Sequence, residues 1–402
     1  SSRHPWFIES RSSRHSPKRD WYLWRDPAPG GGVPNNWISN FGGPAWEWDP
    51  PTGQYYYHAF HREQPDLNWR NPEVQAALCD VMRFWFDRGV DGFRIDVLWH
   101  LVKDAAFRDN PPNPDFRPGM PPHRAVLQKY STDRPEVIEV VRRLRRVADE
   151  YPGRVLIGEI YLPIERLMAY YGEQQDGVHL PFNFQLVTQP WQARGLADTI
   201  ERYEAALPPG GWPNWVLGNH DKSRVASRVG PDQARVAAML LLSLRGTVTL
   251  YYGEEIGMHD VEVPPERRQD PQDAGMPGIG MNRDAYRTPM QWSAESHAGF
   301  SSVEPWLPGA DDRAALNVAA QRDDPDSMLS LYRRLIQLRR REPALVRGRC
   351  RVLANAGNVL ALTREHEGRC FLVALNLGAA PARLEGPDGG WRGRVAVGTE
   401  RA

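Results

Sequence analysis

From about residue 72 to residue 252 the chain alternates between short apolar runs and longer segments whose apolar residues recur with helical spacing. Apolar runs of about four to eight residues predict buried strands, and the periodic segments predict amphipathic helices. The predicted strands span about 90–97, 154–160, 177–184, 212–219 and 246–252. The predicted helices span about 72–88, 135–150, 192–206, 232–245 and 328–341. This alternation predicts a parallel sheet with helices packed around it. The apolar stripe of helix 72–88, which includes Val81 and Trp85, is expected to face the core.

The two ends of the chain have a different pattern. Residues 1–68 are crowded with Trp, Pro, Gly and Asn and contain no long periodic segment, which predicts an irregular region with short strands. From about residue 346 the pattern changes to short β-like runs at 350–353, 359–362 and 371–375. These runs predict a small antiparallel β domain at the C-terminal end.

Three of the predicted parallel strands end in, or just before, a carboxylate. These residues are Asp96 in Gly-Phe-Arg-Ile-Asp-Val, Glu159 in Gly-Glu-Ile and Asp221 in Gly-Asn-His-Asp. An unpaired carboxylate is costly to bury at the end of an apolar strand, so three of them need a common reason. In an α/β barrel the active site lies at the carboxyl ends of the strands. Glycoside hydrolysis uses two carboxyl groups that flank the scissile bond, and it would explain the pattern.

Charge and cysteine content narrow the choice of partner and compartment. The 402 residues contain 50 Lys and Arg and 50 Asp and Glu, so the formal net charge is zero. Net charge therefore gives no reason to expect binding to nucleic acid or to an anionic membrane surface. No apolar run approaches the roughly 20 residues of a membrane-spanning helix. Cys79, Cys350 and Cys370 are scattered and odd in number, which fits a reducing compartment. We therefore expect a cytoplasmic location.

Longer motifs accompany the three strand ends. Gln-Pro-Asp-Leu-Asn stands at 64–68, Tyr-Tyr-Gly-Glu-Glu-Ile-Gly at 251–257 and Arg-Thr-Pro-Met-Gln-Trp at 287–292. With these motifs in this order, the chain resembles the α-amylase superfamily of glycoside hydrolases, in its oligo-1,6-glucosidase and α-glucosidase branch. The resemblance covers essentially the whole chain.

The resemblance implies a (β/α)8 TIM barrel with an insert and a C-terminal β domain. Relatives carry a motif ending in Asn-His, with a substrate-binding histidine, just before a segment like the one that opens this chain. We therefore expect a partial barrel that lacks the first three strands. The expected domains are a loop-rich insert at 1–68, the remaining barrel at 69–345 and an antiparallel β domain at 346–402. The missing N-terminal barrel segment is an expected partner, and without it we expect little or no activity.

The resemblance also assigns roles to individual residues. It implies that Asp96 is the nucleophile and Glu159 the general acid/base of a retaining mechanism. Arg94 lies two residues before Asp96, on the same face of the strand, where its cation would keep the nucleophile charged and oriented.

Three further residues are expected to bind the sugar. The resemblance implies that Asp221 and His220 bind sugar hydroxyls and that Arg287 reaches the first subsite. Val97 follows the nucleophile at a position where relatives acting on α-1,6 bonds tend to carry Val and many maltases carry Thr or Ala. We expect no cofactor and no metal: His58 and His61 are interpreted as loop histidines, because nothing in the sequence supplies further ligands.

The sequence thus predicts a retaining exo-α-glucosidase that acts on α-1,4 or α-1,6 bonds of short oligosaccharides. One alternative is a transglycosylase or isomerase of the trehalose or isomaltulose synthase type, which uses the same three carboxylates. The other is a catalytically silent fragment, or an interaction module like the enzyme-derived ectodomains of amino-acid transporters. Those modules typically lose the carboxylates, whereas this chain keeps all three.

Overall fold

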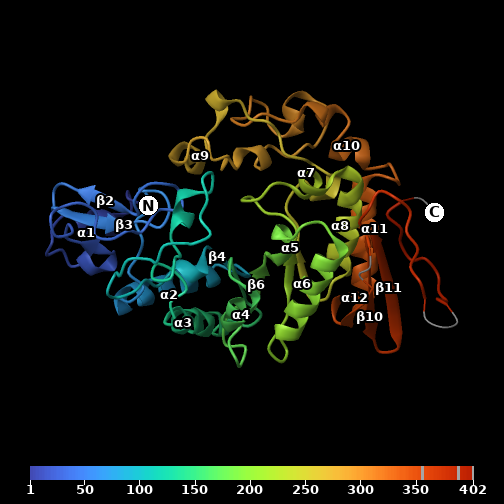
Figure 1. Ribbon diagram of the computed structural model, residues 1–402, viewed down its shortest axis with the longest axis horizontal. Coiled ribbons are helices and arrows are strands. Elements are labelled where there is room, and N and C mark those ends of the chain that lie inside the picture. Colours follow the sequence, from blue (N-terminus) through green and yellow to red (C-terminus); the bar gives the residue numbers. More distant parts are fainter. Residues whose placement is uncertain (355–356, 387–389, 401–402) are drawn as a thin grey trace. The chain divides into compact units, whose positions relative to one another are not determined.

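The computed structural model describes residues 1–354, 357–386 and 390–400, and the chain divides into two compact units. The first unit contains residues 1–160, 169–180 and 269–282, and the second contains residues 161–168, 181–268 and 283–402. Figure 1 shows both, coloured along the sequence. Of the expected C-terminal domain, residues 355–356, 387–389 and 401–402 lie outside the described part. Within the described residues, no helix combines the length and the apolar character that a membrane crossing needs.

The first unit opens with a small antiparallel sheet that is packed with aromatic side chains. The sheet has the order β1-β3-β2, formed by Trp24–Arg25, Gln54–Tyr57 and Trp46–Asp49, and helix α1 spans Pro5–Arg11. The Phe7 ring of α1 stacks on Trp24 at 5.6 Å and meets the edge of Tyr56 at 5.0 Å. These three side chains are buried, so here the aromatic residues form a core.

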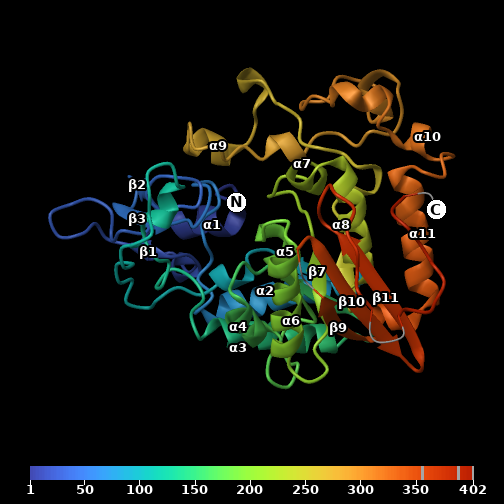
Figure 2. The same ribbon diagram turned by 45° about the vertical axis from the view of Figure 1, so that its right-hand side comes forward.

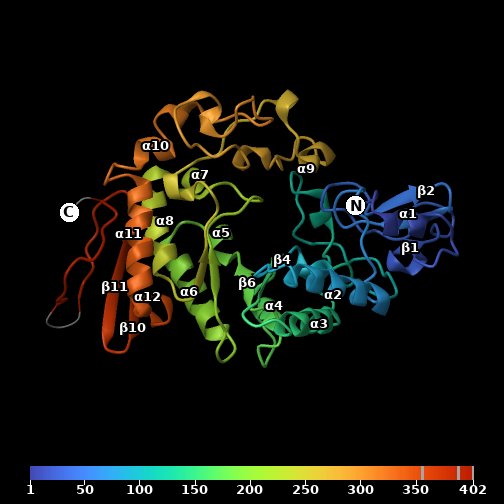
Figure 3. The same ribbon diagram turned by 180° about the vertical axis from the view of Figure 1, so that it is seen from behind.

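Two strand–helix pairs follow in the first unit. Helix α2 (Pro72–Phe86) precedes β4 (Gly92–Ile95), and α3 (Val137–Asp149) precedes β5 (Val155–Gly158). Asn71 begins α2, because its side-chain oxygen accepts the Glu73 N–H at 2.8 Å. The strands β4 and β5 pair in parallel, and α2 and α3 lie side by side (Figure 3). Gly92 is required at the start of this pairing, since a Cβ there would lie 2.1 Å from the Val155 carbonyl oxygen.

The apolar face of α2 differs from the predicted stripe. Val81 and Trp85 are 40% and 45% exposed, and Phe84 is 46% exposed, whereas Cys79 is buried. In the neighbouring strand β4, no residue is fully buried. The expectation that Val81 and Trp85 face the core is therefore wrong for the described residues, and apolar surface remains uncovered beside β4.

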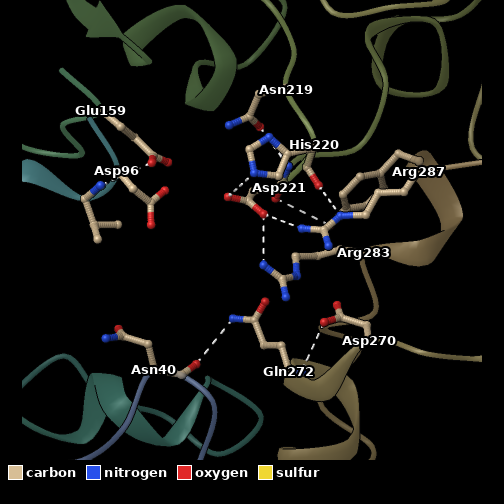
Figure 4. A network of polar contacts seen from close by, with 12 residues as sticks. Asn40, Asp96, Glu159, Asn219, His220, Asp221, Asp270, Gln272, Arg283 and Arg287 are labelled. Atoms are coloured by element: carbon tan, nitrogen blue, oxygen red, sulfur yellow. Dashed lines mark hydrogen bonds and ion pairs between the residues drawn. The ribbon is translucent and has the colours of Figure 1, made fainter. Parts of the chain in front are cut away.

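A distant segment of sequence also belongs to the first unit. Residues 269–282, with helix α9 (Pro271–Gly275), pack against the loop around Asn40, whose carbonyl oxygen accepts the Gln272 amide at 3.3 Å (Figure 4). Gly42 allows this close approach, because a Cβ there would lie 2.3 Å from the Gly275 oxygen.

The second unit contains three parallel strands with helices around them. The strands β6 (Leu180–Asn183), β7 (Asn214–Val216) and β8 (Thr247–Thr249) pair in that order. The longer helices are α6 (Ala193–Ala206), α8 (Pro231–Ser243) and α11 (Met328–Arg341), and the short ones are α4 (Ile164–Leu167), α5 (Gln185–Thr188), α7 (Val225–Val229), α10 (Val318–Gln321) and α12 (Pro343–Val346). Leu242 of α8 and Leu331 of α11 meet in a buried cluster, and the two helices run side by side in Figures 1 and 3.

The C-terminal part of the second unit is the predicted antiparallel sheet. Its strands β9 (Arg349–Ala354), β10 (Val359–His366) and β11 (Arg369–Asn376) place β10 in the centre, and α6 and α12 contact it (Figure 2). The fully buried Arg364 of β10 donates to the carbonyls of Leu345 and Gly348, both at 2.8 Å. The Arg364 guanidinium thus supplies hydrogen-bond donors to carbonyl groups at the C-terminal end of α12, where this helix contacts the sheet.

All five predicted parallel strands are present, and each is shorter than its apolar run suggested. The α/β fold with parallel barrel strands, a loop-rich N-terminal region and a C-terminal antiparallel sheet is confirmed. A closed barrel of this type has about eight strands, so the described residues form part of one.

Candidate active site

In the first unit, Arg94 connects the two carboxyl groups predicted to be catalytic. Arg94 lies in β4, and its Nη1 donates to Asp96 Oδ1 at 2.5 Å while its Nη2 donates to Glu159 Oε2 at 2.5 Å. Asp96 follows the last residue of β4, and Glu159 follows the last residue of β5. Because the two strands are parallel, their carboxyl ends place both side chains at one edge, as Figure 4 shows.

The two carboxyl groups have opposite environments. The Asp96 side chain is 71% exposed, whereas that of Glu159 is 2% exposed. Burial raises the pKa of Glu159 to about 7, and the nearby Asp96 carboxylate adds to the rise, while the Arg94 guanidinium opposes it. Asp96 is exposed and bound to the Arg94 guanidinium. The buried Glu159 can therefore hold a proton near neutral pH beside an exposed second carboxyl group.

The backbone around Glu159 continues the parallel pairing beyond the strands. The Glu159 N–H donates to the Ile95 carbonyl at 2.9 Å, and the Glu159 carbonyl accepts the Leu98 N–H at 3.1 Å. Between these two bonds lies Val97, which is left-handed with φ 35° and ψ 50°. A β-branched residue in this region is strained by about 1–3 kcal/mol, and such strain persists only where surrounding contacts enforce it. Here the Val97 N–H donates to Glu159 Oε2 at 3.3 Å, so the turn that carries Asp96 is fixed by Glu159.

The Gln-Pro-Asp-Leu-Asn motif supports the segment that follows Asp96. Asp66 accepts the Ala59 N–H at 2.8 Å through Oδ2 and binds the Lys103 ammonium through Oδ1. Lys103 also donates to the carbonyl of His100, the last residue of the 3-10 turn Leu98–His100. The Lys103 side chain is only 3% exposed. The motif therefore acts on the site through a buried ion pair, not through the reacting groups.

A second polar group forms in the second unit around Asp221, beyond the end of β7. Arg283 Nη1 and Arg287 Nη2 both donate to Asp221 Oδ1, at 2.9 and 2.7 Å (Figure 4). His220 Nε2 lies 3.5 Å from Asp221 Oδ2. Burial alone would raise the pKa of Asp221, but the charges of His220, Arg283 and Arg287 outweigh it and lower the pKa. Asp221 is therefore held as an anion.

Asn219 and Arg287 shape the turn that presents Asp221. The Asn219 side-chain oxygen accepts the Asp221 N–H at 3.0 Å, and its amide nitrogen donates to the Tyr161 hydroxyl at 3.0 Å. Arg287 Nε donates to the His220 carbonyl at 2.8 Å. Arg287 thus binds both the backbone and the carboxylate of the motif.

The structure therefore brings the predicted site residues together in two groups, each within one unit. Asp96, Glu159 and Arg94 form the first, and Asp221, His220 and Arg287 form the second. Arg283 belongs to the second group but was not predicted. Its one signal in the sequence is a position four residues before Arg287, in the same irregular segment.

Behind the second group lies a buried carboxyl group, that of Glu254. Glu254 is 2% exposed, and neither of its carboxyl oxygens has a hydrogen-bond partner among the described residues. A Cβ on Gly218 would lie 2.4 Å from Glu254 Oε1, so Gly218 is required where the two meet. Burial raises the pKa of Glu254 to about 8, although the charge of Arg228 opposes the rise. Glu254 is therefore protonated at neutral pH, directly beneath the start of Gly-Asn-His-Asp.

The two loop histidines, His58 and His61, make hydrogen bonds to nearby backbone groups. His58 is buried, and its Nδ1 lies 2.8 Å from the Phe60 carbonyl, while His61 Nδ1 accepts the Glu63 N–H at 3.3 Å. In the described part of the chain, no three His, Cys, Asp or Glu side chains converge as ligands for a metal ion.

Comparison with known proteins places the chain in a family. The α-amylase catalytic domain family matches residues 1–348. The chain belongs to the α-amylase family. A probable α-glucosidase of Rhizobium meliloti (strain 1021) is 40% identical over 96% of this chain and 73% of its own length. An oligo-1,6-glucosidase of Heyndrickxia coagulans is 34% identical over 98% of this chain and 77% of its own length. The crystal structure of the α-glucosyl transfer enzyme XgtA has a TM-score of 0.92 at 42% identity, over 96% of this chain and 74% of that one. The predicted membership of the α-amylase family of glycoside hydrolases is confirmed.

The environment of Glu254 predicts a pH dependence of stability in this α-amylase family member. A carboxyl group whose pKa is raised by folding binds more protons in the folded than in the unfolded state, so the free energy of unfolding falls as pH rises between about 4.5 and about 8. We expect Glu254→Gln to make the fall in the free energy of unfolding smaller by on the order of 1 kcal/mol per pH unit. Urea unfolding at several pH values in this range measures the slope.

The neighbouring substitution Glu255→Gln is the matched control, because Glu255 is half-buried and accepts the Gly253 N–H at 2.7 Å. Equal pH slopes for the unmodified chain and Glu254→Gln would show that Glu254 does not hold a proton in the folded state.

Proposed function

We propose that this protein is a retaining exo-α-glucosidase that releases terminal glucose from short α-linked oligosaccharides. Asp96 is the nucleophile and Glu159 is the general acid/base. The observation that carries the proposal is the shared contact with Arg94, which holds an exposed carboxylate beside a buried carboxyl group whose pKa is about 7. This double displacement requires two neighbouring carboxyl groups, one of which holds a proton at the start of the reaction.

In the first step, Glu159 gives its proton to the glycosidic oxygen while Asp96 attacks the anomeric carbon. The bond to the leaving alcohol breaks, and a covalent glucosyl ester forms on Asp96. In the second step, Glu159 takes a proton from water, whose oxygen attacks the same carbon and releases Asp96. Two inversions leave the configuration of the released glucose unchanged.

Asp221, His220 and Arg287 are proposed to bind the hydroxyls of the terminal glucose. The support is the lowered pKa of Asp221, which remains an acceptor for sugar hydroxyls and can stabilise positive charge that develops on the ring. Arg283 joins these residues, because it donates to the same oxygen of Asp221 as Arg287 does.

If Asp96 is the nucleophile, Asp96→Asn should lower kcat by at least roughly a thousandfold, since an amide cannot form the glucosyl ester. Asp91→Asn, at a 94% exposed carboxylate just before the same strand, is the matched control and should leave kcat unchanged. Steady-state assays of a full-length active enzyme measure both. Substantial turnover by Asp96→Asn, or release of β-glucose seen by proton NMR, would refute the retaining role of Asp96.

The second candidate function is α-glucosyl transfer or isomerisation. The likeness to XgtA favours it, because that structure is described as an α-glucosyl transfer enzyme. Both functions share the covalent step and differ in whether water or a sugar receives the glucosyl group. Product analysis on maltose and sucrose separates them: free glucose supports hydrolysis, and new disaccharides support transfer.

The residue after the nucleophile suggests a linkage preference. We infer that isomaltose-type α-1,6 bonds are accepted, whether or not α-1,4 bonds are accepted too, because Val97 is the residue that relatives acting on α-1,6 bonds tend to carry. Val97→Thr keeps a β-branched side chain in the strained turn, so it changes polarity with little change of backbone. We expect this substitution to lower the ratio of kcat/KM for isomaltose over maltose by roughly tenfold. Good activity on maltose with none on isomaltose in the unsubstituted enzyme would contradict the preference.

We propose the domain division 1–68, 69–345 and 346–402, and three further strand–helix units as partners of the barrel part. The first antiparallel sheet lies within 1–68, and the last begins at Arg349. The exposed apolar side chains of α2 and the incompletely buried strands β4 and β8 support the need for further strands.

A cytoplasmic location remains a prediction from the cysteine pattern.

The need for further strands predicts that residues 1–402 alone hydrolyse a nitrophenyl α-glucoside poorly. Supplying the upstream segment of a complete relative in trans should raise the rate by at least roughly a hundredfold. This is the loss of rate that a small misplacement of reacting groups can cause. Equal rates in the two samples would show that the 402 residues are sufficient.

A further inference from the structure

We propose that a cavity between α2 and α3 of the first unit binds a phosphate monoester. The cavity has a volume of about 360 Å³, and the buried side chains of Val102 and Val140 form part of its wall. Three arginines, Arg70, Arg143 and Arg146, also line it. Its volume is within the range of about 300–1,000 Å³ in which small-molecule sites occur. This inference does not rest on the proposed glucosidase activity.

The arginines of α3 differ in their partners. Arg142 binds Glu139 at 2.6 Å and Asp176 at 2.7 Å, and Arg145 binds Asp149 at 2.8 Å. Arg143, by contrast, donates to the neutral side chain of Gln75 at 2.9 Å and has no carboxylate partner among the described residues.

The side chain of Arg146 makes no hydrogen bond or ion pair within the described part of the chain. Arg143 and Arg146 are the two α3 arginines that line the cavity. They lie three positions apart on one helix, where like charges repel each other. An anion between them would remove this repulsion.

The acidic residues of the cavity do not supply that anion. Glu136 is bound by Arg70 Nη2 at 2.8 Å, which lowers the pKa of Glu136. Glu139 also lines the cavity, and it is bound by Arg142, which does not line it. The charges that remain unmatched are therefore the guanidinium groups of Arg143 and Arg146.

A phosphate monoester fits these groups in charge and in shape. It carries close to two negative charges at neutral pH, and its oxygens accept paired hydrogen bonds from guanidinium groups. The cavity is larger than a phosphate ion, and the half-buried Trp69 offers apolar surface to the attached organic group. A neutral sugar would leave both arginine charges without a counter-ion.

The test is isothermal titration of the 402-residue chain at low ionic strength with inorganic phosphate, glucose 6-phosphate and glucose. We expect saturable binding of the two phosphate-bearing probes, with no competition from glucose. Arg146→Gln should weaken binding by roughly tenfold or more, which is the effect of losing one charge-assisted hydrogen bond. The substitution removes no side-chain hydrogen bond or ion pair of the described residues. Arg143→Gln should act in the same direction.

Arg340→Gln is the matched control, because Arg340 is an exposed helical arginine in α11 whose side chain has no hydrogen bond or ion pair within the described residues. Tighter binding of glucose 6-phosphate than of inorganic phosphate would identify an ester site, and equal binding would identify a site for the phosphate group alone. The proposal is overturned if phosphate does not bind saturably, if glucose competes, or if Arg340→Gln weakens binding as much as Arg146→Gln.

Discussion

The chemistry proposed for this protein depends on one arginine that binds two carboxyl groups of different burial. Arg94 gives one nitrogen to Asp96 and the other to Glu159, so a single rigid guanidinium plane fixes both acids. Without this cation, two carboxylates at adjoining strand ends would repel each other. With it, the buried Glu159 still has a raised pKa because burial outweighs the attraction of Arg94. The different roles proposed for Glu159 and Asp96 thus rest on where the strands place the two side chains.

The rest of the first unit keeps this arrangement in place. The strained Val97 turn is held by hydrogen bonds to Glu159, and the segment after it is held by Lys103 and Asp66. In the second unit, Asp221 is held in a comparable way by Arg283 and Arg287, above the protonated carboxyl group of Glu254. Each carboxyl group proposed to act on the sugar therefore has at least one arginine contact.

The sequence predicted the strands and the site residues for a physical reason. An apolar run that ends in a carboxylate is unusual enough to predict both a strand and a candidate site residue at its end, as at Asp96 and Glu159, and the two strands are present. The sequence did not predict Arg283, because a single arginine in a long irregular segment carries no periodic signal. It also did not distinguish Glu254 from Glu255, since only tertiary packing buries one and leaves the other half-buried. The exposure of Val81 and Trp85 could not be predicted from helical periodicity, because the periodicity identifies an apolar face but not what covers it.

The central claim is that burial gives Glu159 a proton affinity unlike that of an ordinary carboxyl group. A carbon-13 NMR titration of the chain labelled at the glutamate side-chain carboxyl measures it, with the Glu159 signal assigned by its loss in Glu159→Gln. The account predicts a midpoint for Glu159 at about pH 7. A midpoint near the unperturbed value of about 4.3 would contradict it.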